Sequence, residues 1–353
     1  MGNETPRLFD ITTPPDLAGA AYENRVREQA RVLKSELIRQ TLEDSASWAR
    51  SVEDKWANDH PDLAPIFPVT DQEIAEYRER VQNSDYEWII PAFEQFITPD
   101  PDQFTPIIAA LGKIEASFDG TLDGEGNWTG PNTNLLRIHD VRTDMDEWAG
   151  AFKNSFIDRF LTPFQGTLLK HAELALIAGD QMRLTKVCYI RQRKSVLELL
   201  DQAINATRAL SNGACSPGDV LKWATIMMVA TGTVVGAYAT GVGIVAGAVC
   251  LEVAGTIGQG LLPQPEEKQK LPLTAPTASE VAMNVSQAIS RLANDLHNME
   301  QVAANALREL HWAVEKERIR AATSNLPGTF TVPAPPLANA TPAQTDQSFF
   351  PDE

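Results

Sequence analysis

The residue types that could do chemistry are few in this sequence and lie far apart. There is no HExxH, GxSxG or GxxxxGK[ST] pattern, so no zinc protease, serine hydrolase or phosphate-binding loop is indicated. The five histidines lie in separate segments, at no spacing that is typical of metal ligands. They are His60, His139, His171, His297 and His311. We therefore expect a protein without enzymatic activity.

Two small groups of residues imitate metal sites. His139 lies near three acids, but the spacing is better explained as the solvated acidic face of a helix. These acids are Asp140, Asp144 and Asp146. The three cysteines are odd in number and form no CxxC pair. We expect Cys188, Cys215 and Cys250 each to act as a small buried hydrophobic residue. The sequence therefore predicts no bound metal and no disulfide framework.

Gly241, Gly243 and Gly247 have the spacing of a dinucleotide-binding fingerprint. That motif works as a strand-to-helix turn inside a parallel βαβ unit, because the helix N-terminus must face the pyrophosphate. No such unit surrounds these glycines in the sequence. We therefore expect no cofactor.

The formal net charge of −17 restricts the possible partners. An acidic surface repels the phosphate backbone of nucleic acid, and it is not attracted to anionic lipid. Contact with a membrane would then depend on apolar insertion. The N-terminal residues show neither the basic nor the apolar region of a signal peptide, so no cleaved secretory signal is expected.

One stretch dominates the sequence, at residues 223–251. It holds about 29 residues without a single charge, which is long enough to cross a bilayer. Lys222 and Glu252 bound it. The residues that we predict to enter a membrane are Trp223, Ile226, Met227, Val229, Val234, Val235, Tyr238, Gly241, Gly243, Ile244, Val245, Val249 and Leu251.

Three interpretations of this stretch remain open. It could be a buried hairpin in a helical bundle, or one transmembrane helix with small residues for packing in lipid. It could also be a hairpin, turned at Gly241 and Gly243, that is hidden in the soluble form and inserted on demand. We favour the third, and the many β-branched residues allow either two helices or a β-tongue.

Most of the remaining chain has the apolar period of amphipathic helices. One stripe runs from residue 16 to 59, and a capping box at Thr70 and Glu73 opens a second helix. A third pattern spans residues 104–118. A seam from Leu135 to Phe160, which includes Trp148 as a core residue, predicts the longest helix.

Pro163 is expected to kink or restart this helix, which then continues through residues 168–210. Ser279 is a plausible N-cap for a last long helix with a heptad-like seam. The seam residues predicted to pack against another helix are Leu292, Leu296, Met299, Ala303 and Leu310.

The predicted fold is mainly α: an elongated bundle of long amphipathic helices, with an apolar hairpin inserted between the two longest. We expect a flexible N-terminal arm (1–15) and a helical bundle (16–210). An apolar head with flanking loops follows (211–277), then a coiled-coil-like helix that returns to the bundle (278–323). A tail rich in Pro, Ala and Thr (324–353) is expected to be disordered.

The order of these features resembles the α-helical pore-forming toxins of the cytolysin A type, including haemolysin BL, non-haemolytic enterotoxin and xenorhabdolysin components. The resemblance covers residues 16–323 and is architectural. It implies a secreted virulence protein whose apolar head, at residues 223–262, is folded away until it meets a target membrane. It also implies assembly with further copies or with a partner toxin component.

A second resemblance rests on Trp128-Thr-Gly130, which lies in a predicted turn between helical segments. It is similar to the small WxG-type helical hairpins exported by type VII secretion systems. This resemblance implies export without a cleaved signal. The alternative function is therefore a secreted or structural helical interaction protein, whose seam from Val285 to Ala313 binds a partner helix. A constitutive membrane protein is the other alternative.

Overall fold

The computed structural model describes residues 11–61, 70–124, 127–145, 148, 151–211, 220–221, 271–273, 275–324 and 330. The apolar stretch at 223–251, with all its predicted insertion residues and two of the three cysteines, lies outside these ranges. So does nearly all of the predicted tail. The predictions for these segments stay predictions.

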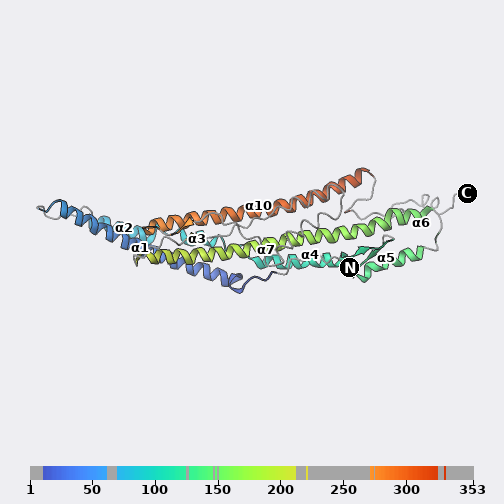
Figure 1. Cartoon of the computed structure of the whole chain (residues 1–353), viewed down its shortest axis with the longest axis horizontal. Coiled ribbons are helices and arrows are strands. Elements are labelled where there is room, and N and C mark those ends of the chain that lie inside the picture. The colour runs from blue at the N-terminus through green and yellow to red at the C-terminus, as the bar shows by residue number, and fades with distance from the viewer. Residues whose placement is uncertain are drawn as a thin grey trace.

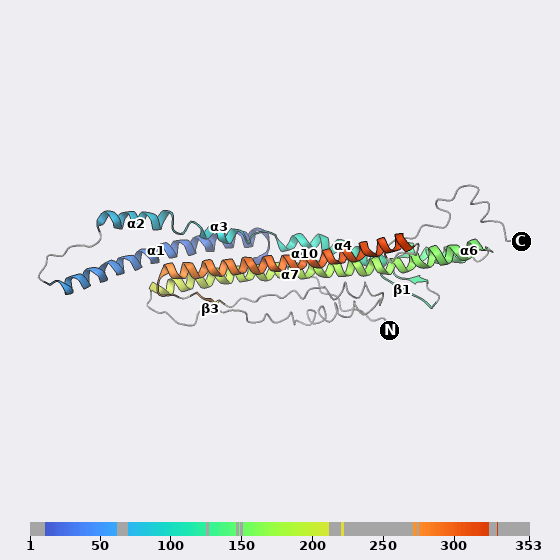
Figure 2. The same ribbon diagram turned by 90° about the horizontal axis from the view of Figure 1, so that it is seen from above.

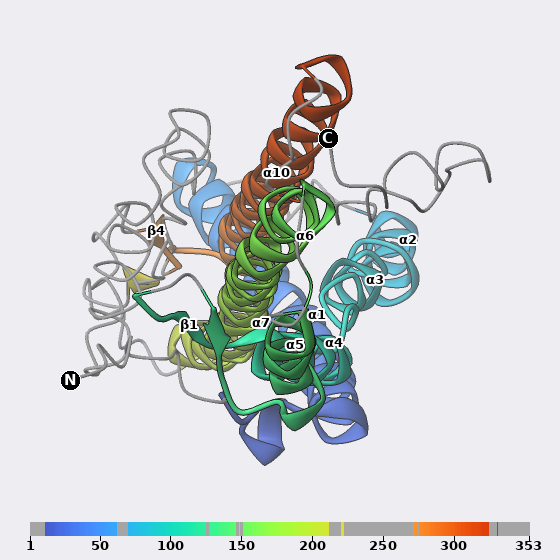
Figure 3. The ribbon, with the colours of Figure 1, turned by 90° about the vertical axis from the view of Figure 1, so that its right-hand side faces the viewer.

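The described chain is mainly helical and forms a long rod (Figure 1). Its axis is α7 (Thr162–Ser211), whose 50 residues span about 75 Å. The return helix α10 (Ala278–Ser324) runs antiparallel to α7, and α1 (Gly19–Asp59) runs parallel to it. Viewed along the rod, α7 lies between α10 and the shorter helices (Figure 3). The predicted apolar head thus falls between the two longest described helices.

Shorter elements complete the rod. They are η1 (Pro15–Leu17), α2 (Asp71–Asn83), α3 (Ile89–Glu94), η2 (Pro101–Phe104), α4 (Thr105–Phe118), α5 (Thr133–Asp144), α6 (Ala151–Phe156) and a π-helical turn (Ile157–Leu161). Two antiparallel strand pairs are present, β1 (Thr121–Leu122) with β2 (Trp128–Thr129) and β3 (Val220–Leu221) with β4 (Leu271–Pro272). Figure 2 shows that α1 extends past the end of α7, with α2 beside it.

The hydrophobic core occupies one half of the rod, where α1, α3, the C-terminal part of α7 and the N-terminal part of α10 meet. Each helix contributes residues at steps of three and four, which places them on one face. Fully buried members include Val26, Leu33, Leu37, Ile89, Phe93, Val196, Leu200, Val281 and Val285. We call this the core half.

Several sequence predictions are confirmed. The helix predicted for residues 104–118 is α4, and the stripe from residue 16 is η1 followed by α1. The capping box is present in full, because Glu73 N–H donates to Thr70 Oγ1 while Thr70 N–H donates to a Glu73 carboxylate oxygen at 2.9 Å.

The predicted seam from Leu135 to Phe160 is wrong. Helix α5 has no buried residue and ends at Asp144, and a separate helix, α6, begins at Ala151. Trp148 lies outside any helix and its side chain is 48% exposed, so it is not a core residue. The π-helical turn before Pro163 shows where the chain is adjusted for a residue that has no N–H.

Two smaller predictions also need correction. The N-terminus of α10 is capped by Thr277, whose Oγ1 accepts the Glu280 N–H at 3.3 Å, and not by Ser279. The turn predicted around Trp128 is a small β-hairpin, because β1 and β2 pair there. A strand of two residues is too short for an alternation of apolar and polar residues to be recognised in the sequence.

Candidate functional site

The chain segment that contains the apolar stretch, residues 222–270, is bounded by the β3–β4 pair. Val220 lies opposite Pro272, and Leu221 lies opposite Leu271. Directly after β4, Leu273 is fully buried and belongs to the core cluster. The chain therefore leaves and re-enters the bundle at one place, next to the core half, whatever lies between residues 221 and 271.

The re-entry point is fixed to α1 by a helix cap. Asp44 Oδ2 accepts the N–H of Ala278 at 2.9 Å, so a carboxylate from α1 stabilises the first turn of α10. Gln40 donates to the other oxygen of Asp44 at 2.9 Å. Because Ala278 is itself buried, this contact anchors the segment's C-terminal flank to the core half.

No helix in the described ranges is long and apolar enough to cross a bilayer. The residues predicted to insert lie between β3 and β4 and are outside those ranges.

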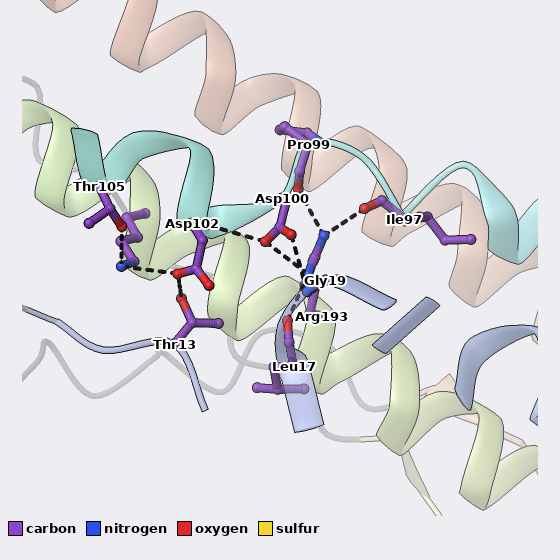
Figure 4. A network of polar contacts seen from close by, with 10 residues as sticks. Thr13, Leu17, Gly19, Ile97, Pro99, Asp100, Asp102, Thr105 and Arg193 are labelled. Atoms are coloured by element: carbon purple, nitrogen blue, oxygen red, sulfur yellow. Dashed lines mark hydrogen bonds and ion pairs between the residues drawn. The ribbon is translucent and has the colours of Figure 1, made fainter. Parts of the chain in front are cut away.

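A buried polar cluster lies where the core half ends, and its centre is Arg193 on α7 (Figure 4). The side chain is 2% exposed, and its Nη1 donates to the Leu17 carbonyl at 2.7 Å. Its Nη2 donates to the carbonyls of Ile97 at 2.6 Å and Pro99 at 3.2 Å. One guanidinium therefore joins three distant chain segments: the end of η1, the α3–η2 loop and α7.

Asp100 supplies the negative charge for this cluster. Its Oδ1 lies 3.4 Å from Arg193 Nη1, and its Oδ2 accepts the Gly19 N–H at 3.1 Å. Gly19 has φ of +43°, a conformation that glycine adopts without the strain of a Cβ. Tyr22 places its ring 4.5 Å from the guanidinium carbon, which adds a cation–π contact.

About two helical turns earlier on α7, Lys186 makes a second contact with the same loop. Its Nζ lies 3.3 Å from Asp102 Oδ1 and donates to Thr105 Oγ1 at 3.0 Å. Thr13, in the segment expected to be flexible, is buried and donates to Asp102 at 2.6 Å. The Thr13 hydroxyl, followed by Lys186, lowers the pKa of Asp102. We call the residues around Arg193 and Lys186 the polar junction.

The polar junction is suited to holding helices in register, because its cations are matched by carboxylates and carbonyls from separate chain segments. The nearby thiol of Cys188 is buried, which raises its pKa to about 12 and makes it inert, as expected for a small hydrophobic residue. No group of potential metal ligands was found in the described ranges.

The Trp128-Thr-Gly130 triplet has a local structural role. Trp128 is 1% exposed, and its backbone N–H donates to Gln165 on α7. Gly120 and Gly130 lie against the indole ring, and a Cβ at Gly120 would be 2.6 Å from Trp128 Nε1. The glycines therefore allow the small hairpin to close over the tryptophan and to dock on α7.

The predicted packing seam on α10 is divided between two environments. Leu292 and Ala303 are buried, while Leu296, Met299 and Leu310 are half-buried. Leu296 packs against the core cluster. Sequence reasoning did not identify Arg193 or Asp44; the only signal was a charged side chain inside an apolar helical stripe.

Comparison with known proteins gave no match, whether to protein-family models, to curated proteins or to solved structures.

Proposed function

We propose that this is a membrane-active, pore-forming protein, which inserts the apolar segment between β3 and β4 into a target membrane. The observation that carries the proposal is the uncharged stretch of about 29 residues, whose two flanks are joined by the β3–β4 pair. Because the chain leaves the bundle at Leu221 and returns beside it at Leu271, the intervening segment can enter a bilayer and return on the same side. The proposed inserted form is therefore a hairpin, of two helices or of two strands.

The rest of the chain supports this proposal as a scaffold. The flanks are fixed to the core half through Leu273 and through the Asp44 cap, so the segment can move without unfolding the bundle. Burying apolar surface in lipid returns about 25 cal/mol per Å², provided that backbone groups pair within helices or between strands. A pore further requires several copies, or a partner component, around one opening.

Dye release from liposomes tests the proposal. Val235→Asp and Ile244→Asp each place a charge in the apolar segment, which costs about 2.5–3.5 kcal/mol near a bilayer centre. We expect both variants to lose release while their helical circular dichroism stays unchanged. Met283→Asp is the matched control, since Met283 is an exposed apolar residue on α10 and its variant should release dye as the parent does.

Release by Val235→Asp and Ile244→Asp at the rate of the parent would refute insertion of this segment. Solubility without detergent distinguishes the proposal from a constitutive membrane protein, which would need detergent to stay monomeric.

The second candidate is a helical interaction protein, and the observation in its favour is on α10. No described side chain of this helix between residues 307 and 323 is buried, so a long helical surface is available to a partner. Deleting residues 223–262 separates the two functions: partner binding should persist, and dye release should be lost.

A further inference from the structure

Helix α10 is continuous, but its two parts are packed very differently. The first part contributes a regular series of buried residues to the core half, which are Ala278, Val281, Ala282, Val285, Ala288, Ile289 and Leu292. After Ala306, no described residue of α10 is buried. The outer face of the second part carries Trp312, 68% exposed, and Ile319, 62% exposed.

The figures show the same contrast in space. Figure 1 shows that α10 lies close to α7 at its N-terminal end and moves away from it toward its C-terminal end. Figure 3, viewed along the rod, also shows the two helices separating. The two parts of α10 therefore differ in how strongly α7 holds them.

A part-buried hydrogen bond between α7 and α10 lies at this change. Tyr189 on α7 donates from its hydroxyl to Glu300 Oε1 at 2.6 Å. A hydrogen bond to a carboxylate is short and stronger than a neutral one, and burial strengthens it further. The Tyr189 ring stacks on Phe104 with centroids 5.5 Å apart, so the donor is held in place from the other side.

Beyond Glu300, the helix has ion pairs within its own turns. Arg318 pairs with Glu315 at 2.7 Å, and Arg320 pairs with Glu317 at 2.8 Å. Pairs at this spacing favour a helix even without a packing partner. The C-terminal part can therefore leave α7 and remain helical.

We propose that residues 297–324 form a hinged arm, which opens away from α7 as an intact helix while residues 278–296 stay in the core half. The hydrogen bond between Tyr189 and Glu300 is the clasp that holds the arm closed. Opening exposes Ala303, Ala306 and Leu310, which are buried or half-buried in the closed form. This inference concerns described residues alone and stands or falls independently of membrane insertion.

Amide hydrogen exchange on the full chain, followed by mass spectrometry, tests the arm. In the parent protein we expect amides in 303–323 to exchange about 100-fold faster than those in 281–292, because local opening exposes them without global unfolding. Tyr189→Phe keeps the aromatic ring and removes the clasp. It should speed exchange in the arm by a further factor of about ten and leave 281–292 unchanged.

Tyr22→Phe is the matched control, because the Tyr22 hydroxyl is also buried but has no hydrogen-bond partner among the described residues. It should not alter exchange in the arm. Glu300→Ala removes the clasp from the other helix and should reproduce the effect of Tyr189→Phe. Equal protection along the whole of α10, or an effect of Tyr189→Phe that spreads equally over 281–292, would overturn the hinge.

Discussion

The two halves of the rod are built on different principles. The core half is held by aliphatic and aromatic side chains from α1, α3, α7 and α10. The other half, which we call the polar half, contains α4, α5, α6, the N-terminal part of α7 and the C-terminal part of α10. There α7 buries mostly small or polar side chains, including Gln165, Thr167, Ala172, Ala175, Gln181, Thr185 and Lys186.

This difference indicates where the molecule can change shape. Apolar burial contributes free energy in proportion to area, and large side chains are concentrated in the core half. The polar half depends more on individual hydrogen bonds and on contacts within each helix. Because local opening begins where few apolar contacts are lost, we expect the polar half to open first and the core half to unfold last. The polar junction lies at the boundary.

The largest expected effect is at that boundary. Arg193→Met keeps an unbranched side chain but removes the charge, so three carbonyls lose this donor and the Asp100 carboxylate loses its cationic partner. Removing one partner of a buried ion pair typically costs about 3–5 kcal/mol. We expect a loss of that size in the free energy of unfolding, measured by urea denaturation.

Arg25→Met is the control for this change. Arg25 is 43% exposed and lies near Asp16 and Asp201 on the surface, at 3.6 and 3.8 Å. Exposed ion pairs contribute little, so its loss should be below about 1 kcal/mol. Equal losses for the two variants would mean that the polar junction does not stabilise the fold.

A pair of leucines compares the two halves directly. Leu200 is fully buried in the core half, and Leu200→Ala should cost about 3 kcal/mol of unfolding free energy through lost burial and a new cavity. Leu310 is half-buried on the arm of α10, and Leu310→Ala should cost below about 1 kcal/mol. Urea denaturation monitored by circular dichroism measures both. Similar losses would show that the halves are equally packed.

Much of the fold follows from apolar periodicity. The spacing of Val26, Leu33 and Leu37 predicts the buried face of α1, and the capping box at Thr70 predicts the start of α2. These features are local, so the sequence near them contains the information. The heptad-like seam from Val285 to Ala313 likewise predicts α10, because seven-residue repeats favour packing against a neighbouring helix.

The wrong and missing predictions concern features that depend on tertiary contacts and not on the local sequence. Phe152, Phe156 and Phe160 continue the period of Leu135 and Val141, but the chain leaves the helix after Asp144 and no large core forms there. The polar junction was not predicted because its acceptors are backbone carbonyls from segments about 90 residues and more away in sequence. A side-chain pattern cannot show which carbonyls will meet a guanidinium.

The smallest expected effect concerns pH and tests the electrostatic part of the polar junction. The pKa of Asp102 is lowered in the folded state, first by the Thr13 hydroxyl and then by Lys186. The charged carboxylate is therefore favoured by folding, so its contribution is complete above the unfolded pKa near 4 and is lost as pH falls below it. Asp180 contributes to the pH dependence of stability in the opposite direction. Burial raises the pKa of its carboxyl group, so folding disfavours the charged form.

Thermal unfolding at pH 5.5 and pH 3 measures both contributions. Asp102→Asn removes a group that loses stability on acidification, so the fall in melting temperature between the two pH values should be smaller than in the parent. Asp180→Asn removes a group that gains stability on acidification, so the fall should be larger. A variant of Asp102 with the same pH dependence as the parent would show that Lys186 and Thr13 hold this loop through geometry alone, and that charge at the boundary between the two halves does not stabilise it.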